Sequence, residues 1–593
     1  MARISRLFDL LTHYNEKYSD LPIALAGKVN GEWKNISSSQ YIDTVNTLSR
    51  GLLSLGIKKG DKIATIINNS PEWNFFDMAI MQIGAVNVPV YPTLSETNYE
   101  YIFKEAEVKI IIVSNSEIYG RIEKILSLIP TLKNVYFISK TYNAGNWYEL
   151  LNLGKSNPGI NLDNIKSQIS EKDLATIIYT SGTTGNPKGV MLSHSNLVSN
   201  FMACSDILSK NPVKSSLSFL PLCHVYERML NYVYQYNGIS IYYADSIDKL
   251  RDYLNEVRPE FFCAVPRVIE KTYAKLVRTG RGLKGIKKQL FFWALNLAHR
   301  FEFDDRNGHF YEFQRRWADR LVYRRWRQAF GGELQVIVTG GASINPLLSR
   351  TFWAAKIKIM EGYGLTETSP VIAVSNFEKG GVHFGTVGRT LPGVEIKLAD
   401  DGEILCKSPG LMMGYYKQPE LTKEVIDAEG WFHTGDAGEW VDKVYLKITD
   451  RKKEIFKTSG GKYIAPQVVE NEFKESPFIE NIMIIGENRN YTTALIVPNF
   501  EHIESWCRVK NHHYSTPANS ILDERILKRL QKEVDTINSR LDKIEQVKKF
   551  RLLAENWKVE SGELSPTMKL RRKVILEKYK VIIDEMYNHK GLM

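Results

Sequence analysis

Apolar and polar residues alternate along roughly the first 170 residues in a way that predicts helices and strands in turn. Residues 41–55 carry apolar side chains at helical spacing, whereas 62–67, 85–90 and 109–113 are short apolar runs typical of buried strands. Residues 71–83, between the first two runs, again have the pattern of a helix. Strands that alternate with helices predict a parallel sheet with helices on both of its faces.

The middle of the chain contains apolar runs that end in glycine or polar residues. Residues 334–342 and 358–368 are two such strand-to-loop transitions. In α/β folds, loops at the carboxyl edge of the sheet are the usual place for a nucleotide. Strand-and-turn patterns at 385–396 and 401–410 predict a small β subdomain.

The last part of the chain has a pattern of its own. Residues 482–485 and 493–497 are short apolar runs, and 522–541 is a charged stretch with apolar residues at helical spacing. Residues 467–593 are therefore expected to form a small α+β domain, separate from the larger α/β part.

Length and composition agree with this division. A chain of 593 residues is too long for one core, and its hydrophobic content of 43% is ordinary for a globular protein. No run of about 18 apolar residues predicts a transmembrane helix, and the first residues lack the features of a signal peptide. The five cysteines have no paired spacing, which argues against a disulfide scaffold or a zinc site and favours the cytoplasm.

Positive charge is concentrated in one segment. The formal net charge is +11, and residues 271–328 hold fifteen Lys or Arg against five Asp or Glu, a difference of +10. Many aromatic residues share this segment. The combination is typical of an interfacial helix on anionic lipid, of a nucleic-acid contact, or of a solvated helical hairpin whose rings pack on the main domain.

The stretch with the strongest chemical signal follows the apolar strand 175–179. Its hydroxyl, glycine and lysine residues are Thr180, Ser181, Gly182, Thr183, Thr184, Gly185, Lys188 and Gly189. Glycines allow backbone N–H groups to approach a ligand, and hydroxyls and a lysine add donors and charge, which suits a polyphosphate. The spacing differs from a Walker A loop, because Gly189 stands where Ser or Thr should follow the lysine.

This stretch resembles the phosphate loop of the adenylate-forming enzymes, which include acyl-CoA synthetases, luciferases and peptide-synthetase adenylation domains. Further stretches resemble the same family in the expected order, at 218–228, 361–368, 430–436, 449–466 and 563–572. The resemblance covers roughly residues 40 to 580. It implies a large domain (1–450) of layered α/β sheets plus a small β subdomain, a hinge (451–455) and a mobile α+β domain (456–593).

The resemblance also implies the nucleotide site. The residues expected to hold the nucleotide are Thr180, Ser181, Gly182, Thr183, Thr184, Gly185, Lys188, Gly341, Ala342, Gly362, Tyr363, Gly364, Thr366, Asp436 and Arg451. Tyr363 offers a flat stacking face for adenine, and Asp436 can accept from both ribose hydroxyls. Thr184 and Glu367 would hold Mg²⁺, for which a carboxylate beside phosphates is a suitable ligand.

Four residues are expected to act in catalysis: Lys569, Thr184, His224 and Glu367. In the family, the residue at the position of His224 lies beside the carboxylate and the adenylate. A loop histidine with an ordinary structural partner is the alternative. The sequence Tyr226-Glu-Arg228 favours the branch that acts on long-chain acids.

The resemblance gives the carboxyl-terminal residues their expected roles. Lys453 would be the hinge about which the small domain turns, and Lys569 the catalytic lysine on a mobile loop. Gly460, Gly461 and Lys462 would lie at the channel for the CoA pantetheine.

The reaction implied is the activation of a long-chain fatty acid with ATP to an acyl-adenylate, followed by transfer to CoA. A ligase that loads an acyl-carrier protein, and a non-catalytic lipid or nucleotide sensor, are the alternatives. Because fatty acids partition into membranes, we expect residues 271–328 to contact a membrane and not nucleic acid. The expected location is the cytoplasm, with peripheral attachment to the inner face of the membrane.

Overall fold

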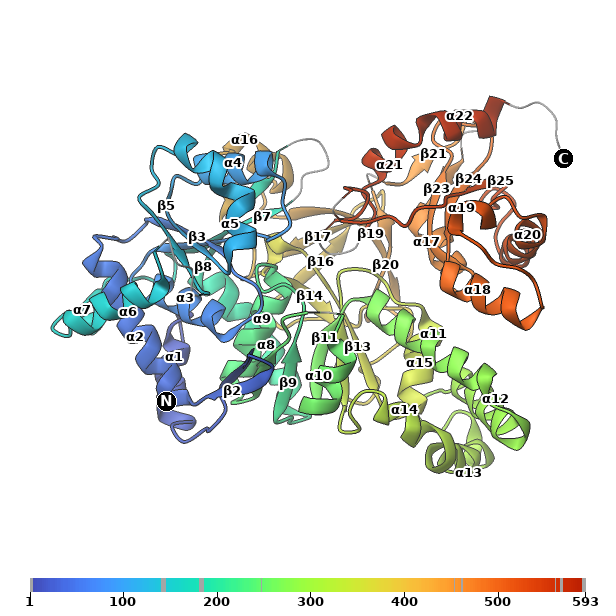
Figure 1. Cartoon of the computed structure of the whole chain (residues 1–593), viewed down its shortest axis with the longest axis horizontal. Coiled ribbons are helices and arrows are strands. Elements are labelled where there is room, and N and C mark those ends of the chain that lie inside the picture. The colour runs from blue at the N-terminus through green and yellow to red at the C-terminus, as the bar shows by residue number, and fades with distance from the viewer. Residues whose placement is uncertain are drawn as a thin grey trace. The chain divides into compact units, whose positions relative to one another are not determined.

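The computed structural model in Figure 1 describes residues 4–139, 145–180, 186–246, 248–452, 454–459, 462–559, 561–565 and 569–588. The chain divides into two compact units. The first comprises Met1–Lys397, Leu405–His433 and Asp442–Leu446, and the second Leu398–Ile404, Thr434–Val441 and Lys447–Met593. The fold is α/β, with a larger amino-terminal and a smaller carboxyl-terminal part, as predicted.

The described part of the first unit contains a sheet with the strand order β18-β8-β7-β4-β3-β5-β6. Its strands are β3 (Lys62–Ile66), β4 (Val86–Pro89), β5 (Val108–Val113), β6 (Asn134–Phe137), β7 (Leu174–Thr180), β8 (Lys188–Ser193) and β18 (Gly414–Tyr415). Strands β3 to β7 pair in parallel, which confirms the parallel sheet that the apolar runs predicted. Toward one edge of the sheet, β8 pairs antiparallel with β7, and the edge strand β18 pairs antiparallel with β8.

Helices accompany this sheet in the predicted order. They are α1 (Asp9–Lys17), α2 (Ser38–Ser54), α3 (Pro71–Gln82), α4 (Glu96–Glu105), α5 (Ser116–Ile122), α6 (Trp147–Ser156) and α7 (Leu162–Ser167). Helix α2 begins where Ser37 and Gln40 form a capping box, which satisfies donors at the helix start. The helices predicted at 41–55 and 71–83 are therefore confirmed.

A second sheet of the first unit has the order β15-β14-β13-β12-β11-β9-β10-β1-β2. Its strands are β1 (Leu25–Val29), β2 (Glu32–Ile36), β9 (Ser215–Ser218), β10 (Ser240–Tyr243), β11 (Phe261–Ala264), β12 (Val336–Thr339), β13 (Lys358–Gly364), β14 (Val371–Val374) and β15 (Arg389–Thr390). The strands from β13 to β1 are parallel. Strand β15, expected in the small β subdomain, instead pairs with β14 at the edge of this sheet.

Two helices link the sheets. Helix α3 contacts β3 and β4 of one sheet and β1 of the other, and α9 (Val225–Tyr236) contacts β9 and β10. From α9, Arg228 reaches Thr176 on β7. Most residues of both helices are buried, as expected for helices between two sheets.

Further helices of this unit are α8 (His194–Ser209), α10 (Leu250–Val257), α11 (Pro266–Gly282), α12 (Gly285–His299), α13 (Gly308–Ala318), the π-helical turn η2 (Asp319–Tyr323), α14 (Arg324–Gln328), α15 (Pro346–Ala354) and α16 (Pro419–Val425). Helix α8 contacts β8 of the first sheet, and α16 contacts β18 of the same sheet. Within the described ranges, we find no helix that combines the length and the apolar character needed to cross a membrane.

A four-stranded sheet has the order β16-β17-β19-β20. Its strands are β16 (Glu395–Leu398), β17 (Glu403–Lys407), β19 (Phe432–Val441) and β20 (Tyr445–Arg451). This sheet is the small β structure that the strand-and-turn patterns predicted.

The carboxyl-terminal part of the second unit is α+β. Its three-stranded sheet has the order β23-β24-β25, with β23 (Ile479–Ile485), β24 (Thr493–Pro498) and β25 (Lys549–Leu552). Helices α17 (Pro466–Phe473), α18 (Phe500–Val509), α20 (Glu524–Asn538), α21 (Arg572–Lys578) and α22 (Lys580–Asn588) accompany it. The predicted strands and the helix at 522–541 are confirmed.

Candidate active site

The phosphate-loop stretch lies between two neighbouring strands. Thr180 ends β7, Lys188 begins β8, and the two residues face each other in the antiparallel pair. Both are half-buried. The two residues that flank the phosphate-loop stretch therefore lie side by side at the end of the β7–β8 pair. The central residues Ser181, Gly182, Thr183, Thr184 and Gly185 lie outside the described residues.

Glu367 lies close to this hairpin through a residue that the sequence analysis missed. The Tyr415 hydroxyl donates to Oε1 of Glu367 over 2.9 Å, and Lys188 Nζ lies 5.3 Å from the centroid of the Tyr415 ring. Burial first, and then the charge of Glu367, raise the pKa of Tyr415, so its hydroxyl keeps its proton and remains a donor. Tyr415 thus links the lysine of the phosphate loop to the proposed metal ligand.

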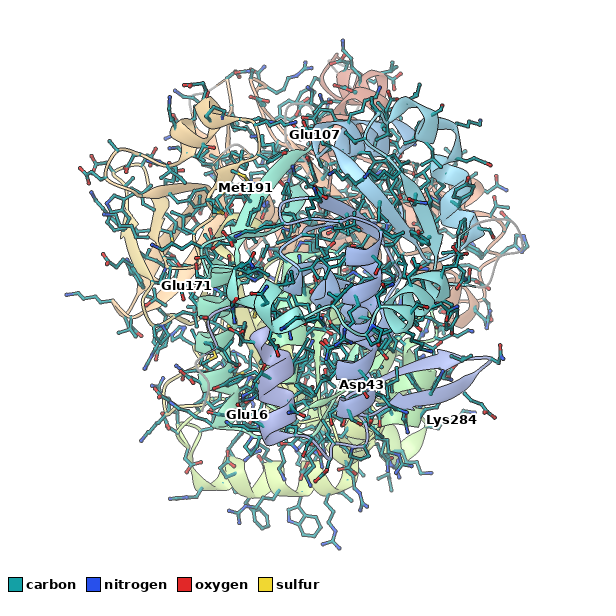
Figure 2. All side chains as sticks on the ribbon, turned by 90° about the vertical axis from the view of Figure 1, so that its left-hand side faces the viewer. Glu16, Asp43, Glu107, Glu171, Met191 and Lys284 are labelled. Atoms are coloured by element: carbon teal, nitrogen blue, oxygen red, sulfur yellow. The ribbon has the colours of Figure 1, made fainter. Side chains whose placement is uncertain are left out.

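Backbone hydrogen bonds hold Tyr415 in this place. Gly414 and Tyr415 form β18, which pairs with Met191 and Val190 of β8, and Met412 N donates to the carbonyl oxygen of Glu367 over 2.8 Å. Met191 is labelled in Figure 2. The segment 412–415 therefore connects β8 to the short 3₁₀ turn that carries Glu367.

Replacing Tyr415 by phenylalanine should lower the affinity of the protein for Mg²⁺ and leave the fold intact. The change removes only the hydroxyl that orients Glu367, and loss of such an outer partner typically costs about 10–100-fold in metal affinity. The Mg²⁺ concentration that gives half-maximal adenylate formation should rise by about that factor. Tyr416→Phe, next in the chain, is the matched control; an unchanged Mg²⁺ dependence in Tyr415→Phe would contradict the link.

The Glu367 carboxylate fits a magnesium ion that takes most of its ligands from phosphate and water. It is half-buried, and its turn also contains the buried Thr366. Within the described residues, no three His, Cys, Asp or Glu side chains gather as a metal site. A single carboxylate is nevertheless the usual protein contribution when Mg²⁺ binds with substrate phosphates.

The residues expected around adenine follow two adjacent parallel strands. Gly341 and Ala342 come after β12, and Gly362, Tyr363 and Gly364 are the last residues of β13. Because β12 and β13 run in parallel, these residues lie at the same carboxyl edge of the sheet, where Gly362, Tyr363 and Gly364 pair with β14. This edge is the one that the strand-to-loop transitions predicted.

Close backbone approaches explain the glycines here. A Cβ on Gly340 would lie 3.3 Å from the Gly362 carbonyl oxygen and 3.4 Å from Cζ of Tyr226, and Gly341 has φ of +83°. A Cβ on Gly364 would lie 1.8 Å from the Pro370 carbonyl oxygen. The Tyr226 ring therefore lies next to the loop that follows β12, a position that the sequence analysis did not predict.

His224 has a structural role at the start of a helix. It is the N-cap of α9, and its Nδ1 accepts a hydrogen bond from the backbone N–H of Tyr226 over 3.2 Å. A neutral imidazole that accepts at Nδ1 carries its proton on Nε2. This contact gives His224 a structural partner at the helix start and leaves Nε2 as the protonated nitrogen; its catalytic role remains a prediction.

The two residues after Tyr226 lie in the core. Arg228 is fully buried; its Nη2 lies 2.5 Å from Asp77 Oδ1, and its Nη1 donates to Thr176 Oγ1 over 2.8 Å. Glu227 accepts from Ser218 Oγ over 2.6 Å, and burial raises the pKa of Glu227 to about 8. Arg228 therefore fixes α9 to α3 and to β7, the strand that leads into the phosphate loop, and Glu227 fixes α9 to β9.

The second unit brings three of the predicted residues together. Arg451 Nε on β20 lies 3.4 Å from Oδ1 of Asp436 on β19, and Asp436 is buried. Lys569 is near enough for their charges to act on it: burial and then Arg451 lower the pKa of Lys569 to about 8, against the opposing charges of Asp436 and Glu454. The proposed ribose residues and the proposed catalytic lysine are therefore neighbours within the second unit.

Local contacts position Lys569. Its backbone N–H donates to Ser565 Oγ over 3.1 Å, and its carbonyl oxygen accepts from Ser565 N over 2.8 Å. Three residues further on, Arg572 Nε donates to Glu454 Oε2 over 3.0 Å, and Nη2 reaches the buried Glu470 over 2.5 Å. Arg572, which the sequence analysis missed, joins the lysine segment to residue 454, beside the proposed hinge.

The proposed hinge and CoA-channel residues fall mostly outside the part of the chain that the structure describes. Lys453, Gly460 and Gly461 lie outside the described residues. Lys462 is exposed, and its backbone N–H and carbonyl oxygen take part in three hydrogen bonds with Thr458. The assigned roles of all these residues remain predictions.

Comparison with known proteins identifies the class. The chain belongs to the AMP-binding enzyme family: the family model described as AMP-binding enzyme matches residues 11–416, and that described as AMP-binding enzyme C-terminal domain matches residues 453–591.

The relatives extend over nearly the whole chain. The long-chain-fatty-acid–CoA ligase FadD15 of Mycobacterium bovis is 32% identical over 571 residues, which cover 94% of this chain and 93% of that protein. The peroxisomal long chain acyl-CoA synthetase 6 of Arabidopsis thaliana is 31% identical, with 97% and 84% covered. Both similarities extend across the family domains at each end of the chain.

Solved structures share the fold. The adenylation domain of a carboxylate reductase from Mycobacterium chelonae has a TM-score of 0.76 at 22% identity, covering 98% of this chain and 91% of that one. A fatty acyl CoA synthetase of Mycobacterium tuberculosis has a TM-score of 0.63 at 20% identity, covering 98% and 99%. The resemblance to the adenylate-forming fold that the motifs indicated is thus confirmed.

Proposed function

We propose that this protein activates long-chain fatty acids to acyl-CoA through an acyl-adenylate, with release of AMP and pyrophosphate. The observation that supports this most directly is the similarity of about 30% to long-chain acyl-CoA ligases over more than nine-tenths of the chain. The arrangement of Asp436, Arg451 and Lys569 adds support, because a nucleotide site needs acceptors for ribose and positive charge for phosphate.

In the first half-reaction, an oxygen of the fatty-acid carboxylate attacks the α-phosphorus of ATP. A new P–O bond forms, the bond to the bridging oxygen breaks, and pyrophosphate leaves. Lys569, with the phosphate loop that begins at Thr180, would stabilise the charge that develops on the phosphate oxygens. No protein nucleophile is required, so the contribution of the chain is to position and to neutralise.

His224 and Glu367 would support this step from the first unit. The Nε2–H of His224 would donate to the substrate carboxylate, since Nδ1 is already used in the helix cap. Glu367 and Thr184 would hold Mg²⁺, which when bound would neutralise phosphate charge.

In the second half-reaction, the CoA sulfur attacks the acyl carbonyl carbon, and AMP leaves with the oxygen that bound it. We propose that residues 456–593 turn about Lys453 between the two steps, withdraw Lys569, and open a thiol channel beside Gly460, Gly461 and Lys462. The proposed domain limits are 1–450, 451–455 and 456–593, and the family models, which end at 416 and begin at 453, support this division.

The proposal includes a place of action. We infer a cytoplasmic enzyme whose segment 271–328 contacts the inner face of a membrane, where long-chain acids are concentrated. The described cysteines are all free thiols, which supports a reducing compartment.

The decisive experiment measures CoA-dependent AMP formation with saturated and unsaturated acids from two to eighteen carbons. We expect the highest kcat/KM between twelve and eighteen carbons. Pyrophosphate release without CoA-dependent AMP formation would indicate that the acyl group is transferred to an acceptor other than CoA. No activity with any of the acids would refute the proposed function.

A further inference from the structure

The aromatic and basic segment forms a helical layer that is firmly attached along one side. Its inner residues, among them Phe291, Leu295 and Trp326, form a buried cluster with Ala354 and Ala355 beside α15. The helices α12, α13 and α14 lie together at one end of their unit in Figure 1. This attachment buries only one side of the helical layer, and the other side of α13 does not take part in the cluster.

Hydrogen bonds fix the rotation of α13 and of the turn after it. The Tyr311 hydroxyl donates to the Leu297 carbonyl oxygen over 3.0 Å, and the Tyr323 hydroxyl donates to the Ala294 carbonyl oxygen over 2.7 Å. Both donors are tyrosines of the inner side that reach the backbone of α12. The side chains on the opposite side of α13 are consequently held away from α12.

That opposite side carries large apolar residues. They are Phe310, Phe313, Trp317 and Leu321, with exposed fractions of 74%, 57%, 50% and 42%. Steps of three, four and four residues place them on one helical face, which runs from α13 into η2 and which we name the outer face of α13. An exposed row of this size is unusual for a surface that faces only water.

The acidic side chains of α13 and its following turn are neutralised locally. Glu312 lies 2.7 Å from Arg315, and Asp319 lies 2.5 Å from Arg327 and 2.7 Å from Lys356. These pairs lie toward the protein, because each of the five side chains except Lys356 is mostly buried. The negative charge of the helix therefore does not reach its outer face.

The positive charge does reach the surface. The exposed arginines of this stretch are Arg316, Arg320, Arg324 and Arg325. The exposed Asp304 and Asp305 precede the helix and flank only its amino end. An apolar row bordered by arginines complements a surface that is apolar inside and negatively charged outside.

We propose that the outer face of α13 inserts among the lipids of an anionic bilayer, with Arg316, Arg320, Arg324 and Arg325 on the headgroup phosphates. Long aromatic rings suit the boundary between acyl chains and headgroups, where Trp and Phe are favoured. The inference deepens the proposed function, because it rests on an acid substrate that is stored in the bilayer. It assigns the membrane contact to one helical face and not to the whole of residues 271–328.

The test compares two variants of the full chain in sedimentation with vesicles. In the first, Phe310→Ser, Phe313→Ser and Trp317→Ser are combined; in the control, Val509 and Val581 of the second unit, which are also exposed, become serine. The vesicles are pure phosphatidylcholine or phosphatidylcholine with about one-third phosphatidylglycerol. All five positions are exposed, so both variants should keep the unfolding midpoint of the parent.

We expect the parent and the control to bind the anionic vesicles, less so at high salt, and the triple variant to bind at least tenfold more weakly. Equal binding by the triple variant, or no binding by the parent at low salt, would overturn the proposal. Sedimentation velocity gives a further test. If the parent is a dimer and the only change in the triple variant is the loss of that dimer, the outer face joins two copies of the chain and the proposal is overturned.

Activity separates this proposal from the proposed function. The triple variant should act normally on dissolved octanoate and show a raised apparent KM for oleate supplied in anionic vesicles. A parent that binds vesicles but activates no fatty acid would refute the proposed function and leave the membrane contact standing. Equal losses on both substrates would show that the outer face acts through the catalytic site, and would overturn the inference.

Discussion

The Lys569→Ala protein should lose adenylate formation by about 10²–10³-fold, because one preorganised positive charge is removed from the developing phosphate charge. Fatty-acid-dependent exchange of pyrophosphate into ATP measures this half-reaction. Thioester formation from supplied acyl-AMP and CoA should stay within about threefold of the parent, since our proposal withdraws Lys569 before that step. Equal loss of both half-reactions would contradict the assigned role.

The control for this variant is Lys573→Ala, an exposed lysine on the helix that follows. It should leave both half-reactions unchanged, because Lys573 lacks the burial of Lys569. The comparison separates the specific charge at position 569 from the general positive charge of the region.

The same lysine predicts the alkaline side of the pH profile. Burial and the charge of Arg451 lower the pKa of Lys569 to about 8, so the ammonium form, present below that value, is lost as the pH rises through it. The kcat/KM for adenylation, which reports the free enzyme, should fall through this range. In Lys569→Arg the residual activity should lack this fall, because arginine stays protonated.

The Arg228→Met protein should be strongly destabilised, by about 3–5 kcal/mol, because it leaves the charge of Asp77 buried without its partner. Both side chains of this pair are fully buried. Asp77 also accepts from the Tyr232 hydroxyl over 2.6 Å and from Asn87 Nδ2 over 2.8 Å, so it cannot turn outward without breaking these bonds. Apparent midpoints of urea and thermal unfolding measure the effect, since a chain with two units need not unfold in one step.

Two comparisons test the electrostatic cause. The exposed pair Arg121–Glu117 offers a matched surface control, and Arg121→Met should change stability by less than about 1 kcal/mol. Adding Asp77→Asn to Arg228→Met should recover part of the lost stability, because no uncompensated charge then remains. If Arg121→Met and Arg228→Met shift the midpoints equally, the buried pair does not have the importance we assign to it.

Much of the fold follows from apolar patterning. The runs at 62–67 and 109–113 became β3 and β5 with shifts of one residue at an end, because strands buried on both faces need continuous apolar sequence. The two-residue strand β15 was placed in the wrong sheet. So short a segment carries no periodicity, and its partner β14 was not separately predicted.

The candidate site was predictable only where a motif marks it. Tyr415 lies 48 positions from Glu367 and Asp77 lies 151 from Arg228, so neither contact leaves a local pattern in the sequence. The cap made by His224 was missed for a different reason. Helix starts are usually marked by Ser, Thr, Asp or Asn, and a histidine in that position gives no comparable signal.

The short strand β18 also has a consequence for assembly. Without Gly414 and Tyr415, β8 would be the free border of its sheet, with unpaired backbone groups able to recruit a strand from another molecule. The tyrosine that orients Glu367 therefore belongs to the segment that closes this border. A change that detaches the segment would inactivate the protein and make it self-associate at the same time, so lost activity and aggregation would share one cause.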